Sequence, residues 1–209
     1  MSRMRSLSGL AAALALGLAA CGDFTSSGDP LSESEAAALA EALAEGGFAG
    51  FGAQGAAPMG APSEAAARVT VTLNDTAPCD DAGGTVAVAG SMTVDINQTT
   101  NVGTFEFNYT IAPHGCQVTT EGGKVFTLDG DPNLTVTGNF DWSETSADGS
   151  LTYDGKFKWE ASDGRAGACG VNLTATYDFN FGTTGSSGSA TLNGTVCGVT
   201  VNRTVSVDA

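Results

Sequence analysis

The chain has 209 residues and a formal net charge of −15, with 8 basic residues against 23 acidic ones. So few basic side chains argue against nucleic acid as a partner, and against electrostatic docking on anionic lipid, because both need a Lys/Arg footprint on phosphate. Glycine is abundant, with 29 residues, and long helical patterns are scarce. The length allows one or two domains, and the composition favours an acidic, all-β protein.

Residues 1–20 have the pattern of a signal peptide. Arg3 and Arg5 precede an apolar run from Leu7 to Leu18, which is too short to span a bilayer as a mature helix. The run ends in Leu-Ala-Ala-Cys, with the cysteine at position 21. The position of this cysteine directly after the apolar run points to processing at that site.

The four residues that end at Cys21 resemble the lipobox of bacterial lipoproteins, which has leucine, two small residues and then cysteine. The resemblance implies thioether lipidation of Cys21, cleavage before it, and a lipid anchor in a membrane of the bacterial cell envelope. Gly22, and not Asp, follows the cysteine. By analogy with enterobacterial sorting, this favours the outer membrane over the inner one. The alternative is an ordinary secretory signal with a chance cysteine.

Residues 21–67 have the composition of a Gly/Ala-rich tether that contains one short helix. Ser32 and Glu35 form a capping box in front of an alanine-rich run, and Gly46-Gly47 predicts where the helix stops. A helix this short is marginal alone in water. We therefore expect the segment to be a flexible spacer.

Residues 68–209 predict one antiparallel β domain. Apolar and polar residues alternate in runs that are separated by turn residues, which is typical of a meander. We expect about eight or nine strands in a curled sheet, either a sandwich or an up-and-down barrel. The parity of the apolar positions changes between Gly194 and Gly198, where a bulge or a bend is the simplest explanation.

The central hairpin of this sheet is predicted between Leu134 and Trp159. A polar turn ending in Asp148-Gly149 separates its two strands, and pairing Trp142 with Leu151 places every apolar residue on one face. A single apolar face is the condition that fixes the register of a hairpin.

Four cysteines remain after Cys21, and an even number in an exported chain suggests disulfides, with three possible connectivities. Two pairs each bracket a predicted hairpin, so antiparallel pairing would bring the members of each pair together. We therefore favour Cys79–Cys116 and Cys169–Cys197. Each bridge would contribute about 3 kcal/mol in the loop-entropy model.

Residue types that carry chemistry are few. His114 is the only histidine, and its neighbour Cys116 is assigned to a disulfide, so neither a Cys/His nucleophile nor a zinc site is expected. The stretch 129–133 resembles the start of a calcium loop but lacks its later ligands, and we interpret it as a turn. Asp141 and Asp154 share a polar face and could form a carboxylate pair, although a solvated charge pattern is simpler. We expect no catalytic residue, no metal and no cofactor.

The aromatic residues of the β domain lie on the apolar parity, so the polar face offers no platform for stacking sugars or bases. The apolar face is either a packed core or the wall of a cavity. Arg203 interrupts this face between Val201 and Val205. It is either an inward charge on an edge strand or an anchor for a ligand.

Together these patterns predict a lipid-anchored β domain of the cell envelope with a non-enzymatic interaction or structural role. Its expected partners are the membrane, through the lipid, and either a protein or a small apolar ligand. The alternative is a barrel-like carrier of such a ligand, and a hydrolase ranks third. A transmembrane barrel fits less well, because its aromatic residues would gather in girdles at the strand ends.

Overall fold

The computed structural model describes residues 27–52, 66–79, 83–97, 99–182 and 185–207. Within these residues the strands form one antiparallel sheet in sequence order from β2 to β9, and β1 pairs with β7. An all-β meander of eight or nine strands with one helix is thereby confirmed. The elements are β1 (Ser27–Gly28), α1 (Glu33–Gly52), β2 (Ala66–Pro78), β3 (Thr85–Asn97), β4 (Val102–Thr119), β5 (Val125–Trp142), β6 (Ser146–Ala161), β7 (Ala166–Gly182), β8 (Gly185–Val196) and β9 (Val199–Val207).

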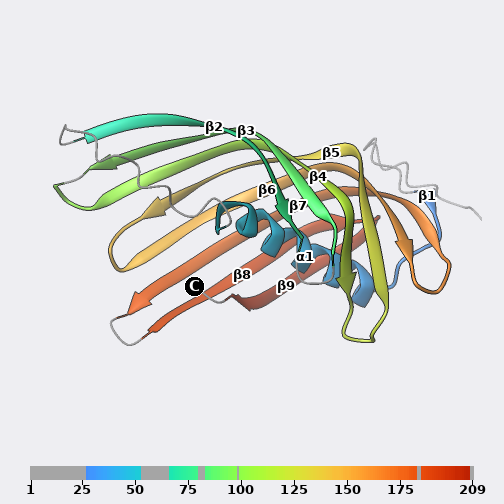
Figure 1. Cartoon of the computed structure of the whole chain (residues 1–209). Helices are drawn as coiled ribbons and strands as arrows, with labels where there is room; N and C mark the ends of the chain where they lie inside the picture. Colours follow the sequence, from blue (N-terminus) through green and yellow to red (C-terminus); the bar gives the residue numbers. More distant parts are fainter. Residues whose placement is uncertain (1–26, 53–65, 80–82, 98, 183–184, 208–209) are drawn as a thin grey trace, which may run out of the picture.

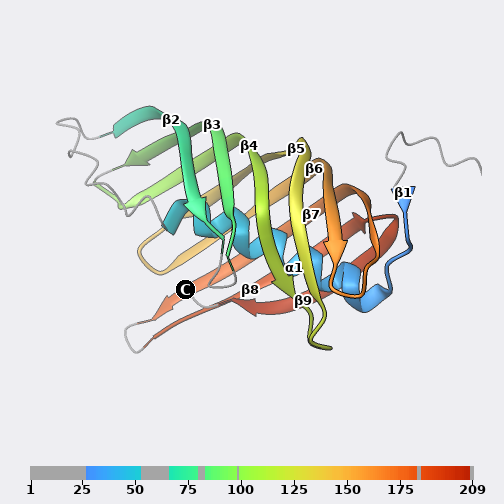
Figure 2. The same ribbon diagram turned by 45° about the vertical axis from the view of Figure 1, so that its right-hand side comes forward.

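The sheet curls around α1, so that the helix lies on its concave side (Figures 1 and 2). The helix contacts β8, β9 and β4. Side chains along each strand alternate between the concave and convex faces, and those of the concave face form the core with the helix. Its fully buried members include Leu39, Leu134, Val136, Leu151, Tyr153, Phe157, Leu173 and Leu192.

The segment predicted as a flexible spacer therefore contains a packed helix. The capping box is confirmed, because the Ser32 N–H donates to Glu35 Oε2 (2.9 Å) and the Glu35 N–H donates to Ser32 Oγ (3.3 Å). The predicted stop at Gly46-Gly47 is wrong, because α1 continues to Gly52. A glycine costs a helix only about 1 kcal/mol, and helices in proteins are stabilised mainly by tertiary packing.

The register of the central hairpin also differs from the prediction. Trp142 pairs with Ala147, and Leu151 pairs with Gly138, so the strands are shifted by four residues. The tight turn lies earlier, where the Ser143 N–H donates to the Ser146 carbonyl (2.8 Å). Gly149 lies within β6 opposite Phe140, where a Cβ would come 2.8 Å from Phe140 Cγ. The β5 backbone is closer still, with the Asn139 carbonyl oxygen 2.2 Å from that Cβ position, so the glycine allows the two strands to approach and does not mark a turn.

The parity change after Gly194 has a third explanation that the sequence prediction missed. Val196 pairs directly with Val199, and the two residues between them have positive φ angles, 54° at Cys197 and 80° at Gly198. Such a two-residue turn has the backbone of the tight hairpins that match the twist of strands. The chain therefore reverses into β9, and the expected bulge or bend is not needed.

The meander has two ends. The "β1 end" contains β1, the start of α1 and the turns β2–β3, β4–β5, β6–β7 and β8–β9. The "opposite end" contains the turns β3–β4, β5–β6 and β7–β8 and the last residues of β9. Figure 1 shows α1 running from the first end toward the second. Within the described part of the chain, no helix has the length and apolar character to cross a membrane.

Candidate functional site

Both predicted cysteine pairs are found at disulfide distance. Cys79 lies 5.6 Å from Cys116 and Cys169 lies 4.3 Å from Cys197, measured between Cα atoms. The first pair ties the end of the edge strand β2 to β4, across β3. The second ties β7 to the β8–β9 turn. Cys21, the predicted lipidation site, lies outside the described residues.

Arg203 lies on β9, an edge strand, and its charge has a partner inside the curl. Its Nε lies 2.8 Å from Glu41 Oε1 on α1, an ion pair without hydrogen-bond geometry, and one terminal nitrogen lies 3.8 Å from Glu121 Oε1. The arginine side chain is 44 % exposed. This ion pair accounts for a charge on the apolar parity without a ligand, so Arg203 as a ligand anchor has no support in its contacts.

The concave face meets α1 through small side chains on the helix and aromatic rings on the sheet. Ala36, Ala40 and Ala44 are buried together with Leu39 and Leu43. These helix residues form one core cluster with the aromatic residues of β4 to β7. Short side chains let the helix backbone approach the sheet, so the helix occupies the space that a ligand would fill in a barrel.

Buried tyrosines hold the helix against the aromatic wall, as we call the aromatic residues on the concave face of β4 to β7. The Tyr177 hydroxyl donates to the Ala44 carbonyl at 3.1 Å, and it lies 3.3 Å from the Tyr153 hydroxyl. Burial raises the pKa of Tyr153 well above its ordinary value, and it raises the pKa of Tyr109 in the same way. Both phenols are therefore neutral at physiological pH, and the hydroxyls of Tyr153 and Tyr177 satisfy each other and the helix carbonyl at Ala44.

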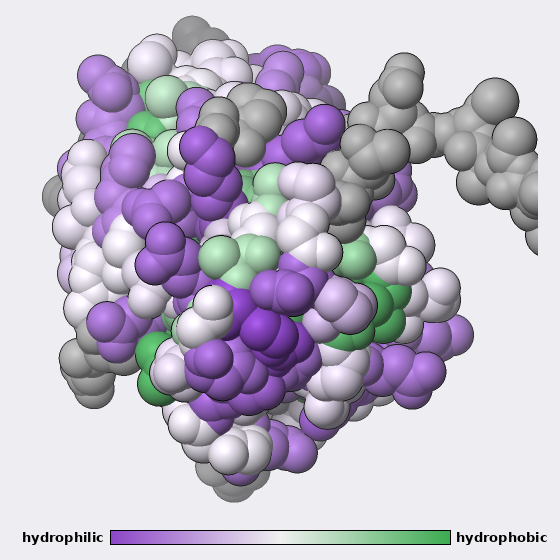
Figure 3. Space-filling view, turned by 90° about the vertical axis from the view of Figure 1, so that its right-hand side faces the viewer, coloured by the Kyte–Doolittle hydropathy of each residue, from purple (hydrophilic) through white to green (hydrophobic). Residues whose placement is uncertain are grey.

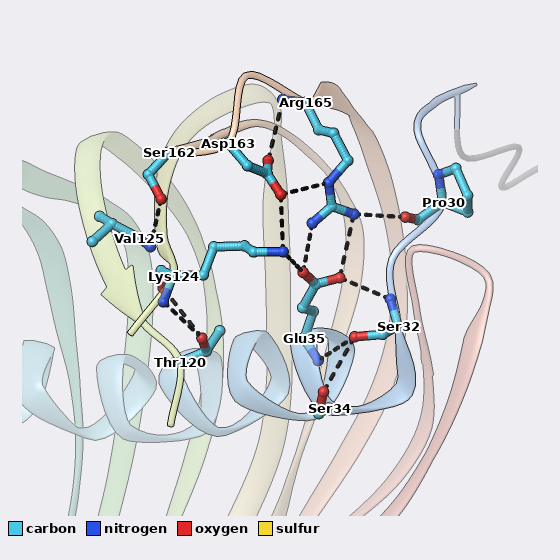
Figure 4. Close-up of polar contacts among 10 residues, drawn as sticks. All are labelled: Pro30, Ser32, Ser34, Glu35, Thr120, Lys124, Val125, Ser162, Asp163 and Arg165. Carbon is cyan, nitrogen blue, oxygen red and sulfur yellow. Dashed lines mark hydrogen bonds and ion pairs between the residues drawn. The ribbon is translucent and has the colours of Figure 1, made fainter. Parts of the chain in front are cut away.

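A cluster of four charges closes the β1 end over the start of α1. We call Glu35, Lys124, Asp163 and Arg165 the "charge cluster". Figure 4 shows the Glu35 carboxylate between the two cations, at 2.6 Å from Lys124 Nζ and 2.5 Å from a terminal nitrogen of Arg165. Asp163 bridges the same two cations, at 2.9 Å and 3.0 Å. The charge cluster therefore joins the helix to the β4–β5 and β6–β7 turns.

The ion pairs hold both carboxylates of the charge cluster ionised. The Arg165 guanidinium lowers the pKa of Glu35 from 4.5 to about 2, against the opposing effect of burial, with Lys124 adding to the shift. Lys124 and then Arg165 lower the pKa of Asp163 to about 2. The two positive and two negative charges balance. We therefore interpret the charge cluster as a structural ion-pair network that holds α1 to the two turns, and not as a proton-transfer site.

The other carboxylates singled out from the sequence do not form a site. Asp141 pairs with Asp148, whereas Asp154 pairs with Thr135. Six residues of β5 separate these rows, which is about 20 Å of strand, so Asp141 and Asp154 do not form the carboxylate pair that was the less favoured alternative from the sequence. The register shift in the central hairpin is the reason.

The stretch 129–133, interpreted from the sequence as a turn and not as a calcium loop, lies within β5, so the turn is wrong; β4 and β5 are both irregular there. The registers shift between Ile111 and Cys116 on β4 and between Gly130 and Leu134 on β5. Asp129 Oδ1 accepts a hydrogen bond from the Gly115 N–H at 3.0 Å. This carboxylate therefore supports an irregular stretch of the sheet, beside the lone His114.

Within the described ranges, no group of three or more His, Cys, Asp or Glu side chains is placed to hold a metal ion. In comparisons with known proteins, no protein-family model, no curated protein and no solved structure matches the chain. The arrangement of the residues is therefore the basis for a functional proposal.

Proposed function

We propose that the protein is a lipid-anchored β domain of the bacterial cell envelope with a non-enzymatic interaction or structural role. The anchor is supported by the Leu-Ala-Ala-Cys sequence that ends at Cys21. The non-enzymatic role is supported by one observation above all, the packing of α1 into the concave face of the sheet. The Gly22 that follows the cysteine favours the outer membrane as its location.

A second candidate is a carrier of a small apolar ligand, and one feature favours it. On the concave side of β2 to β4, Val69 is 41 % exposed and Val71, Met92 and Phe105 are only partly buried. These side chains would form the wall of a site next to α1. The helix, however, covers the deeper part of the same face, so we prefer the first proposal.

The anchor is tested by Cys21→Ser. Without the sulfur nucleophile no thioether lipid can form, so we expect the variant to leave the membrane fraction or to accumulate as an uncleaved precursor. Gly22→Asp is a matched control in an enterobacterial host, because it keeps the cysteine and should move the protein to the inner membrane. Membrane fractionation and labelling with a radioactive fatty acid provide the readouts. Wild-type protein that never takes up the label would exclude the anchor.

A further inference from the structure

We propose that the β1 end of the domain lies against the lipid surface that holds Cys21, while the acidic opposite end points away from it. This orientation rests on the lipidation of Cys21 proposed above. It assigns the membrane-facing surface to the β4–β5, β6–β7 and β8–β9 turns and to the start of α1. Figure 3 faces this end, where hydrophilic residues gather at the centre with hydrophobic residues beside them.

The point at which the chain enters the fold is fixed at the β1 end. Ser27 pairs with Ala168 and Gly28 pairs with Gly167. Arg165 of the charge cluster also donates from a terminal nitrogen to the Pro30 carbonyl at 2.9 Å. The strand β1 and the charge cluster therefore hold the first described residues onto the β6–β7 hairpin.

The tether between the lipid and this entry point is short. Only residues 22–26 separate Cys21 from Ser27, and such a segment reaches at most about 20 Å when fully extended. A tether of residues 21–67, as predicted from the sequence, would reach roughly 150 Å. Because β1 and α1 are packed in the fold, only residues 22–26 are left to act as the tether. The β1 end therefore stays next to the bilayer.

The distribution of charge then decides which end turns away. Asp141, Asp148 and Asp178 lie directly opposite one another on β5, β6 and β7, toward the opposite end. Glu144 lies in the turn beside them, and Asp95 lies near the end of β3. Arg68 is the basic residue among the described residues of this end. Its side chain forms an ion pair with Glu106 at 2.7 Å.

The β1 end is also acidic, but its excess of negative charge is smaller, because outside the charge cluster its described carboxylates Asp29, Glu33, Glu121 and Glu160 stand against the base Lys158. Lys124 and Arg165 offset Glu35 and Asp163 in the charge cluster. Lys158 lies in the same row of the sheet as Ser27, because both pair with Ala168. An anionic headgroup layer repels carboxylates that come within a Debye length, about 8 to 10 Å. The more acidic opposite end is therefore disfavoured at the membrane surface. The strands β6 and β7 have 16 and 17 residues, so the opposite end lies about 50 Å from the β1 end along the strands.

The orientation is tested with single fluorescent labels on the full-length lipidated protein. Gly122→Cys labels the β4–β5 turn, where a Cβ meets only Thr120 Oγ1 at 3.8 Å. Thr145→Cys is the matched label in the exposed β5–β6 turn of the opposite end. Each protein is inserted into phosphatidylcholine vesicles that contain phosphatidylglycerol and a lipid with a nitroxide on its headgroup. We expect the label at 122 to lose most of its fluorescence and the label at 145 to keep most of it.

A variant with a longer tether tests the physical reason. About ten Gly and Ser residues inserted after Gly22 make a flexible coil, and we expect the difference between the two labels to shrink. An unchanged difference would contradict the role of the short tether. Equal quenching at 122 and 145 in lipidated protein would overturn the orientation alone. Mass spectrometry that finds no lipid on Cys21 would overturn both the orientation and the anchor.

Discussion

Replacing Phe157 with Ala is expected to lower the free energy of unfolding by about 3–5 kcal/mol, because it removes buried apolar area and leaves a cavity. Phe157 is 0 % exposed on β6, opposite Cys169 on β7 and Gly130 on β5. A domain is typically stable by about 5–15 kcal/mol, so this change removes a large part of the total. Urea unfolding followed by circular dichroism measures the loss.

Glu160→Ala is the matched control for Phe157→Ala, because it lies on the same strand but is exposed on the convex face. We expect it to change the stability by less than about 0.5 kcal/mol. A small loss for Phe157→Ala, together with saturable binding of a hydrophobic fluorescent probe by the native wild type, would contradict a packed core. It would favour a cavity on the concave face, and with it the carrier.

Glu35→Gln is expected to lower the free energy of unfolding by about 2–3 kcal/mol at neutral pH. The Glu35 side chain is only 9 % exposed and contacts both Lys124 and Arg165. The glutamine keeps the size and the capping position, but it leaves the two cations with Asp163 as their remaining counter-charge. The start of α1 would then be held less firmly to the β4–β5 and β6–β7 turns.

The pH dependence of this effect follows from the pKa of Glu35, which is lowered from 4.5 to about 2 in the folded protein. A carboxylate with a lowered folded-state pKa stabilises the fold above its unfolded pKa, and this contribution disappears as the pH falls through the folded value. The difference between wild type and Glu35→Gln should therefore be constant above about pH 5 and shrink between pH 4.5 and pH 2. Glu33→Gln, a change at an exposed residue of the same first turn, is the matched control and should change the free energy of unfolding at neutral pH by less than about 0.5 kcal/mol. A gap between wild type and Glu35→Gln that does not depend on pH would exclude the ion pairs as its cause.

The alternation of apolar residues was sufficient to predict the strands, the meander and the cysteine pairs. It was not sufficient to predict the register of β5 and β6. A strand repeats every two residues, so a shift of four residues leaves every apolar side chain on the same face. The turn decides between such registers, and here Ser143 closes it with hydrogen bonds to the N–H groups of Thr145 (3.3 Å) and Ser146 (3.1 Å). Asp148-Gly149 had the composition of a turn, but the glycine is needed because the β5 backbone at Asn139 and Phe140 leaves no room for a Cβ.

The position of α1 was also beyond the reach of the local pattern. The capping box at Ser32 and Glu35 signals where the helix begins, but nothing near it in the sequence signals a partner. Lys124 and Arg165 are 89 and 130 residues away from Glu35 along the chain. The small residues Ala36, Ala40 and Ala44 resemble those of a spacer, and only the aromatic wall of the sheet gives them a packing role.

Native mass spectrometry of the protein purified from its own host tests most directly whether α1 fills the concave face. If the helix and the aromatic wall form a closed core, the mass should equal that of the mature polypeptide with its N-terminal lipid and two disulfides. A further apolar molecule that is retained in stoichiometric amount would contradict this account and identify the protein as a carrier.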